Sequence, residues 1–305
     1  MYEVYAMINH LNLELFGGCN YTCKICPQGI YQREKPFLTH LPFKFAKDII
    51  EHAQMHGIKS VSLQGSGEPI LYKKLKEIIS FCKKLGLKSY ITTNLSTKNV
   101  QELEELFDAG LTSIRVSFIG YDAKTYNEWM GQDKFHDVYD KVCAMYNYNI
   151  SVNCIAIEKY WLDEYKSLFD NKVKFVVWNK HNWSGQLSQE ESSEPCPKVS
   201  WPVLNVRAGG LDGHKGAVVP CCNVLGQDSK AVLGYLDVNT ISEIWNGKAY
   251  NKFRKKHKEG KAHKIDVCKN CDQRSASRDA LLYSNYDVKQ RENHSVWLEN
   301  YRLQK

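Results

Sequence analysis

Short apolar runs alternate with amphipathic stretches along the first 180 residues of the chain. Runs rich in β-branched and aromatic residues predict six strands, at 7–16, 59–64, 88–93, 113–118, 151–157 and 172–178. Apolar positions spaced three or four residues apart predict helices between them, at 43–56, 72–85, 98–109, 135–148 and 160–169. Gly57, Gly86 and Gly110 each follow a predicted helix, where the left-handed residue that ends a helix is usually glycine.

Repeated strand–helix units of this kind predict an α/β fold with a parallel sheet. Six right-handed units in succession curl into a partial (βα)6 TIM-like barrel, whose functional residues gather at the carboxyl ends of the strands. We therefore predict a barrel over residues 1–185. After a polar stretch at 179–197, we predict a smaller loop-rich C-terminal cysteine-cluster domain over 186–280 and a C-terminal helical tail over 281–305.

The composition, with 43% hydrophobic and 25% charged residues in a chain of 305, is typical of a folded protein of two units. No run of eighteen apolar residues and no secretory signal is present, so we expect a cytoplasmic protein that does not bind membranes. The net charge is +7, and much of the excess lies at 252–264. We interpret that segment as a solvated helix end and a loop, and we expect no nucleic acid as a partner, because its single phenylalanine and single glycine do not form the interleaved pattern that suggests base stacking.

Eleven cysteines without an export signal indicate metal binding or catalysis rather than disulfides. Cys19, Cys23 and Cys26 form a Cys-x3-Cys-x2-Cys pattern in the loop after the first predicted strand. Three thiolates on one short loop can hold three irons of a four-iron cubane and leave the fourth iron open to a ligand. The alternative is a zinc-binding loop, but zinc normally takes four ligands and the nearest fourth candidate, His10, lies within the first predicted strand.

This triple cysteine resembles the signature of the radical S-adenosylmethionine (SAM) superfamily, in which it follows the first strand of a partial barrel. The resemblance implies that the open iron binds the amino and carboxylate groups of SAM, and that one-electron reduction yields a 5′-deoxyadenosyl radical. The segment Gly65-Ser66-Gly67-Glu68-Pro69 looks like the glycine-glycine-glutamate-proline motif of that family, which receives the SAM amino group; the serine is a departure. By the same resemblance, the cofactor-binding residues at later strand ends are Thr93, Asn94, Ser117, Ile155 and Ile157.

A second group of cysteines lies in the C-terminal part. Cys268 and Cys271 form a tight pair of the kind that clamps zinc or an iron–sulfur cluster, and Cys196 and Cys221 would complete four ligands. Together with the Asp-Gly turn at 212–213 and the segment 241–246, the order of these cysteines resembles the SPASM or shorter Twitch extension of radical SAM enzymes. We predict one auxiliary 4Fe-4S cluster, since a full SPASM unit with two clusters needs more cysteines; a structural zinc ribbon is the alternative.

Cys222 is adjacent to a predicted ligand, and three roles stay open for it: packing beside the cluster, replacing Cys221 as ligand, or donating a hydrogen atom as a catalytic residue. The resemblance suggests the last role, which a cysteine beside the auxiliary site plays in peptide epimerases. Cys82, Cys143 and Cys154 lie in strand or helix patterns and are predicted core residues.

The resemblance implies an enzyme that cleaves SAM reductively, abstracts a substrate hydrogen and receives its electrons from a flavodoxin- or ferredoxin-type reductant. We predict oxidation of a small polar substrate, sugar-like or aminocyclitol-like, with help from the auxiliary cluster. Only 18 residues precede Cys19, whereas peptide-modifying members often carry a leader-binding domain there. The alternatives are a ribosomal-peptide maturase, either an epimerase or a cross-linking enzyme, and a non-catalytic iron–sulfur electron carrier or zinc-binding module. Candidate cavity residues are Tyr21, Gln28, Tyr31, Arg115, Trp178, His181 and Arg207.

Overall fold

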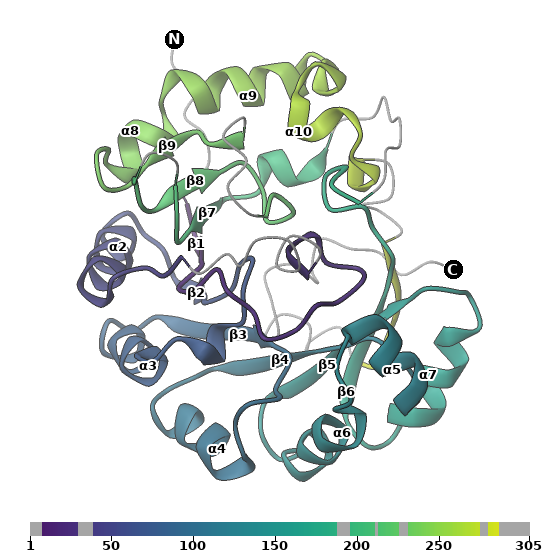
Figure 1. The fold of residues 1–305 in the computed structure, drawn as a ribbon. Helices are drawn as coiled ribbons and strands as arrows, with labels where there is room; N and C mark the ends of the chain where they lie inside the picture. The colour runs from purple at the N-terminus through teal and green to yellow at the C-terminus, as the bar shows by residue number, and fades with distance from the viewer. Residues whose placement is uncertain are drawn as a thin grey trace.

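A curved ten-stranded sheet organises the chain in the computed structural model, which describes residues 8–29, 39–187, 196–210, 213–225, 231–274 and 280–286 (Figure 1). The strand order is β10-β6-β5-β4-β3-β2-β1-β7-β8-β9. The strands are β1 (His10–Leu13), β2 (Ser60–Ser62), β3 (Lys88–Thr93), β4 (Ser113–Phe118), β5 (Ile150–Ala156), β6 (Lys174–Asn179), β7 (Val203–Arg207), β8 (Ala217–Val219), β9 (Gly234–Tyr235) and β10 (Leu281–Ser284).

The six predicted strands are confirmed as a consecutive parallel series from β1 to β6, with a register that pairs Val61 with Ser89 and Val116 with Val152. The sheet does not close, so the predicted α/β partial barrel is confirmed as well. Three glycines that were predicted to end helices, Gly57, Gly86 and Gly110, all have left-handed backbones, with φ of 92°, 72° and 112°.

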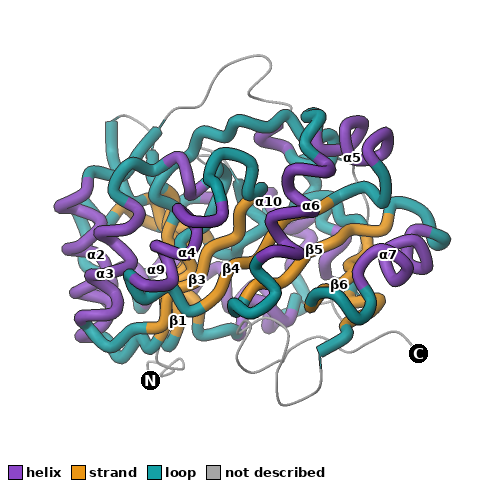
Figure 2. The backbone as a smooth tube through the Cα atoms, turned by 90° about the horizontal axis from the view of Figure 1, so that it is seen from below, coloured by secondary structure: helices purple, strands orange, loops and turns teal. Residues whose placement is uncertain are grey.

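Helices cover the outer face of the parallel strands, and Figure 2 shows them flanking the sheet from a second direction. They are α2 (Phe43–Met55), α3 (Leu75–Lys84), α4 (Val100–Asp108), α5 (Ala123–Met130), α6 (Phe135–Ala144) and α7 (Trp161–Phe169), with a 3-10 turn η1 (Pro69–Leu71) after β2. Their apolar stripes supply the core: Ile78, Ile79, Leu103 and Val142 are fully buried. The sequence pattern did not predict α5, an eight-residue helix whose capping box joins Asp122 and Thr125.

The C-terminal part is continuous with the barrel. β7 pairs in parallel with β1, from His10 opposite Val203 to Leu13 opposite Val206, and β8 and β9 follow in antiparallel order. Small helices surround these strands: η2 (Pro197–Ser200), α8 (Ile241–Trp245), α9 (Lys248–Lys258), η4 (Ala262–Lys264), α10 (Asp266–Lys269) and η5 (Asp272–Arg274). The basic segment at 252–264 is therefore the end of α9 and a short turn, as predicted. The predicted domain at 186–280 shares one sheet with the barrel.

The described start of the predicted helical tail is a strand. β10 pairs antiparallel with β6, and its Leu281 is fully buried against Val176 and Tyr286. The backbone of β10 pairs with the edge strand β6, and this pairing favours an extended chain over a helix. Residues 287–305 lie outside the described part. No helix in the described ranges is long and apolar enough to span a membrane.

Candidate active site

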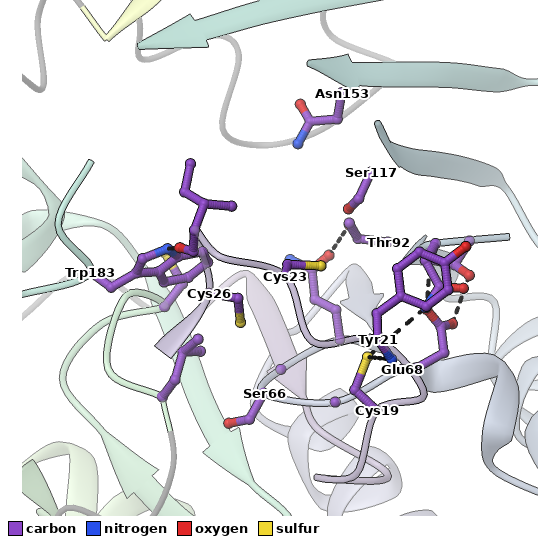
Figure 3. A pocket seen from close by; sticks show the side chains of 18 of the residues that line it. Cys19, Tyr21, Cys23, Cys26, Ser66, Glu68, Thr92, Ser117, Asn153 and Trp183 are labelled. Atoms are coloured by element: carbon purple, nitrogen blue, oxygen red, sulfur yellow. Dashed lines mark hydrogen bonds between the residues drawn. The ribbon is translucent and has the colours of Figure 1, made fainter. Parts of the chain in front are cut away.

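A cavity of about 290 Å³ lies at the carboxyl ends of the parallel strands, and Figure 3 shows side chains that line it. The loop after β1 crosses the arc of strands at this end (Figure 1). Both the barrel and the C-terminal part contribute to its wall. The lining residues are Asn12, Cys19, Tyr21, Cys23, Ile25, Cys26, Gln64, Gly65, Ser66, Gly67, Glu68, Thr92, Thr93, Asn94, Arg115, Ser117, Ile119, Met130, Asn153, Ile155, His181, Trp183, Arg207, Cys222, Asn223 and Leu225.

The three N-terminal cysteines point into one end of this cavity (Figure 3). Their loop is held by backbone hydrogen bonds: Lys24 N donates to Trp129 O at 2.9 Å, and Cys26 N donates to Cys23 O at 3.2 Å. Cys19 Sγ accepts from Tyr21 N at 3.4 Å, and Cys23 Sγ lies 3.9 Å from Met130 Sδ. All three cysteines therefore line the same cavity, and their role as cluster ligands stays a prediction.

The three cysteines are half-buried in the cavity wall, and their electrostatics suit a cationic ligand. Burial raises the pKa of Cys19 to about 12, with Glu68 and Cys26 adding to the effect. Burial also raises the pKa of Cys23 and of Cys26, and the other two thiols add to the rise at Cys23. Thiolates that repel one another in a partly desolvated pocket ionise more readily beside a cationic metal centre, and metal binding would release their protons. The donor set therefore fits an iron–sulfur cluster.

Glu68 lies beside the cysteine loop at the N-terminus of η1. Its carboxylate accepts hydrogen bonds from Ile70 N at 3.0 Å, Thr93 Oγ1 at 2.6 Å and Asn94 N at 2.7 Å. Burial nevertheless raises the pKa of Glu68 to about 7. A buried carboxylate whose only fixed partners are neutral dipoles gains strongly from a nearby ammonium group.

Two glycines of the same motif allow close backbone contact. A Cβ on Gly67 would lie 2.3 Å from Gly18 O and Phe16 O, and Glu68 N donates to Gly18 O at 2.8 Å. A Cβ on Gly65 would meet the carboxylate of Glu14. The motif and the cysteine loop are therefore in direct contact, and only residues without a side chain fit between them.

Glu14 joins three segments of the site and was not predicted. It is 1% exposed, follows β1, and accepts from Ser66 N at 2.5 Å and from Ala208 N, beyond β7, at 3.1 Å. An acidic residue at the end of an apolar strand was the signal in the sequence. Its carboxylate links the motif after β2 to the C-terminal part.

The remaining predicted cofactor residues separate into two groups. Thr93, Asn94, Ser117 and Ile155 line the cavity, at the ends of β3, β4 and β5. Ile157 does not line it and packs against the hydrophobic core instead, because the chain has left β5 by that position. We retain the first four as proposed SAM-binding residues.

The C-terminal cysteines occupy a separate region near α10. Cys221 and Cys268 pack against the same small apolar cluster, made by Val219, Val224, Ala231 and Val267. Burial raises the pKa of Cys196; the charge of Lys198 opposes this rise, and Cys221 adds to it. Burial also raises the pKa of Cys271, and Cys221 again adds to the rise. These four predicted ligands therefore lie near one another. Cys222 faces the cavity, so the geometry favours Cys221 as the ligand.

In the part of the chain that the structure describes, no three Cys, His, Asp or Glu side chains converge on a point for one metal ion. A four-iron cluster spreads its thiolate ligands over several iron atoms and does not require such a point. Of the predicted core cysteines, Cys82 and Cys154 are buried and Cys143 is half-buried.

A second cavity of about 160 Å³ adjoins the first, and both are lined by Gln64, Arg115, Asn153, Ile155, His181, Cys222 and Asn223. Trp178, Lys198 and Gln273 line only the second. Of the candidate cavity residues, Tyr21, Arg115, Trp178, His181 and Arg207 are lining residues. Gln28 is buried and donates to Gly17 O at 3.2 Å, and Tyr31 lies outside the described ranges.

Trp183 was missed because it lies in the polar stretch that was interpreted as a linker. Its indole Nε1 donates to Ile25 O at 2.7 Å, within the cysteine loop (Figure 3), and its φ is 50°. Asn12, Gln64 and Asn223 were missed as well. Asn12 lies within the predicted first strand. Only the alternation of side chains between the two faces of a strand could have indicated that this polar residue points inward.

Comparison with known proteins adds two family matches. Residues 13–158 match the radical SAM superfamily, and residues 213–272 match an iron–sulfur cluster-binding domain of the SPASM type. A relative in Niallia circulans, S-adenosyl-L-methionine-dependent 2-deoxy-scyllo-inosamine dehydrogenase, is 23% identical over 275 residues, which cover 89% of this chain and 94% of the relative.

Two solved structures share the fold. The crystal structure of BtrN in complex with AdoMet and 2-DOIA has a TM-score of 0.62 and 22% identity, covering 88% of this chain and 94% of that one. Streptococcus suis SuiB bound to precursor peptide SuiA has a TM-score of 0.65 and 16% identity, covering 82% of this chain and 67% of that one. At these identities, the likeness shows the fold alone.

Proposed function

Because the chain belongs to the radical SAM superfamily and carries a SPASM-type iron–sulfur domain, we propose that it is an enzyme that oxidises a small polar substrate, sugar-like or aminocyclitol-like. SAM, a SAM-binding 4Fe-4S cluster and auxiliary iron–sulfur chemistry follow from the family. When bound, these groups supply a 5′-deoxyadenosyl radical that takes a hydrogen atom from the substrate, and an acceptor for the second electron.

The chain's own residues would divide the cavity between cofactor and substrate. Cys19, Cys23 and Cys26 would hold the SAM-binding cluster, and Glu68 would bind the SAM ammonium group from its side of the loop. Thr93 and Asn94 fix the Glu68 carboxylate in place, so that little reorganisation accompanies binding. Cys196, Cys221, Cys268 and Cys271 would hold the auxiliary cluster.

The observation that carries the substrate class is the polar lining between the two cysteine sites. Five polar residues line the first cavity: Asn12 on β1, Gln64 after β2, Thr92 on β3, Asn153 on β5 and Asn223 in the loop after β8. Amide and hydroxyl groups match substrate hydroxyl and amine groups in both donor and acceptor capacity. The whole-length similarity to a 2-deoxy-scyllo-inosamine dehydrogenase supports the same class.

The test is anaerobic turnover of the reconstituted holoenzyme with dithionite and SAM, using 2-deoxy-scyllo-inosamine and related aminocyclitols and sugars as probes. We expect one of them to stimulate 5′-deoxyadenosine formation and to yield a product lighter by two hydrogen atoms. Substrate deuterium should appear in the 5′-deoxyadenosine. A probe consumed with no change in mass would refute oxidation.

The position of Cys222 favours a second candidate function, peptide epimerisation. Its thiol lines both cavities and lies 3.4 Å from Asn223 Oδ1, so it is placed to donate a hydrogen atom to a substrate radical. Turnover in deuterated water distinguishes the two functions. An epimerase would incorporate solvent deuterium at the substrate carbon, and a Cys222→Ala variant would lose that product while still cleaving SAM. A Cys222→Ala variant with undiminished oxidation product would eliminate hydrogen donation.

A further inference from the structure

Three buried polar atoms on one side of the first cavity have no hydrogen-bond partner within the described residues: Asn12 Oδ1, Arg207 Nη1 and Asn223 Nδ2. The side chains to which they belong are 1%, 2% and 6% exposed. Leaving a buried polar group without a partner costs about 1–3 kcal/mol, and more for a charged group. Three such atoms on one wall indicate a site that is completed by a ligand.

The neighbouring contacts fix the direction of each group. Arg207 Nε and Nη2 donate to Val224 O at 2.9 and 2.8 Å, and Nη2 also donates to Cys222 O at 3.0 Å, which leaves Nη1 for another acceptor. Asn12 Nδ2 donates to Asn205 Oδ1 at 3.1 Å, so its oxygen is the remaining acceptor. Asn223 Oδ1 faces the Cys222 thiol, so its amide nitrogen is the remaining donor.

The charges around this wall are predominantly positive. Arg115 and Arg207 line the first cavity, and Glu68 is the one acidic side chain among its described lining residues. The carboxylate of Glu68 already accepts three hydrogen bonds at the far end, beside the cysteine loop. Lys198 lies near Cys196 and Cys271, because its charge opposes the rise in the pKa of both thiols. Its charge therefore acts on the auxiliary cysteines. The two arginines therefore give the substrate end of the cavity a positive potential.

We propose that the substrate carries an oxyanion, a carboxylate or a phosphate, bound by Arg207 Nη1 and Asn223 Nδ2, with a neighbouring hydroxyl donating to Asn12 Oδ1. This inference rests on the proposed function and narrows the substrate class to acidic sugars and sugar phosphates. A planar guanidinium with one free nitrogen and an amide donor beside it is suited to an anionic oxygen, and the single acceptor is suited to a hydroxyl. Arg115, on β4, adds charge without being required as a direct ligand.

The test is isothermal titration of the SAM-loaded holoenzyme with inorganic phosphate and, separately, with acetate, with glycerol as a neutral probe. We expect saturable binding of one anion and none of glycerol; the anion that binds tells phosphate from carboxylate. Asn223→Ala and Arg207→Gln should each weaken that binding by about tenfold or more, as expected for loss of a hydrogen bond to a charged group. Iron content is measured for each variant, because Arg207 also holds the loop next to Cys221.

Asn251→Ala is the matched control. Asn251 is a half-buried asparagine on α9 whose Oδ1 also has no partner among described residues, but it lies away from both cavities. Its substitution should leave anion binding unchanged. If Arg207→Gln loses iron, Asn223→Ala alone decides the outcome.

Absence of saturable anion binding to the wild type, or equal binding by wild type and Asn223→Ala, would overturn the proposal. Aminocyclitols, which carry no oxyanion, could then still be oxidised, so the dehydrogenase function would survive that result. If the variants lose anion binding, the proposed subsite is supported. If the same enzyme oxidises none of the probes, the result counts against the dehydrogenase function.

Discussion

Replacing Gly67 by alanine should separate the cysteine loop from the motif after β2. The added Cβ would lie 2.3 Å from Gly18 O and Phe16 O, where ordinary contact begins at 3.4 Å. The two segments must therefore move apart by about 1 Å. That movement breaks the hydrogen bond from Glu68 N to Gly18 O, which is 2.8 Å long.

The cost follows from these two effects. A lost backbone hydrogen bond costs about 1 kcal/mol and overpacking a tight contact costs about 1–3 kcal/mol, so we expect about 2–4 kcal/mol of strain. The strain falls next to Cys19, where it displaces the thiol from its partners. Iron bound per chain should fall, SAM affinity should fall with it, and 5′-deoxyadenosine formation should drop at least in proportion to the iron.

The matched control is Gly86→Ala. Gly86 has a left-handed backbone with φ of 72°, and apart from its own chain neighbours no described atom lies within 4 Å of the position that a methyl group would take there. The cost of this substitution, about 1–2 kcal/mol, is therefore purely conformational and lies after α3. It should lower the thermal midpoint without changing iron content. If Gly67→Ala binds iron and SAM as the wild type does, the close contact has no role in assembling the site.

Three further predictions concern other parts of the site. Burial raises the pKa of Glu68 to about 7. Above about pH 4.5, the unfolded chain therefore releases a proton that the folded metal-free chain retains. The free energy of unfolding should fall by about 3 kcal/mol as the pH rises from 4.5 to 7. Urea unfolding at pH 4.5 and at pH 7 should show a smaller fall in the free energy of unfolding for Glu68→Gln than for the wild type. An equal fall would show that Glu68 does not cause it. Cys268→Ser should lower iron per chain while SAM cleavage persists, measured by iron analysis and 5′-deoxyadenosine yield; unchanged iron would exclude it as a ligand. Trp183→Phe removes the hydrogen bond to Ile25 O, and the loss of about 1 kcal/mol should appear as a lower thermal midpoint, whereas an unchanged midpoint would show that the bond contributes nothing.

The parallel barrel could be predicted because its signals are local. Each strand is a short apolar run, and each helix that follows has a regular apolar stripe, so β1 to β6 were identified within a few residues of their ends. The cysteine loop and the Gly65–Pro69 segment were also recognisable, since a fixed spacing of ligands or glycines is written directly in the sequence. Both lie at strand ends, where a parallel fold gathers functional groups.

Residues whose role depends on distant partners could not be predicted. Glu14 is significant because Ser66 N and Ala208 N both donate to it, and nothing near residue 14 in the sequence reveals either partner. Trp183 lies in a polar stretch, and only the folded chain places its indole against Ile25 O. The strand β10 was mistaken for part of a helix because its pairing with β6 is a long-range contact.

The pairing of β7 with β1 has a consequence for any attempt to divide this protein. A fragment ending near residue 185 would expose the β1 edge from His10 to Leu13, all four of whose residues are buried in the intact chain. An uncovered strand edge presents unpaired backbone groups that recruit other chains, so such a fragment should aggregate. Exchanging the C-terminal part between relatives would succeed only if the replacement brings a strand that continues this ladder in register.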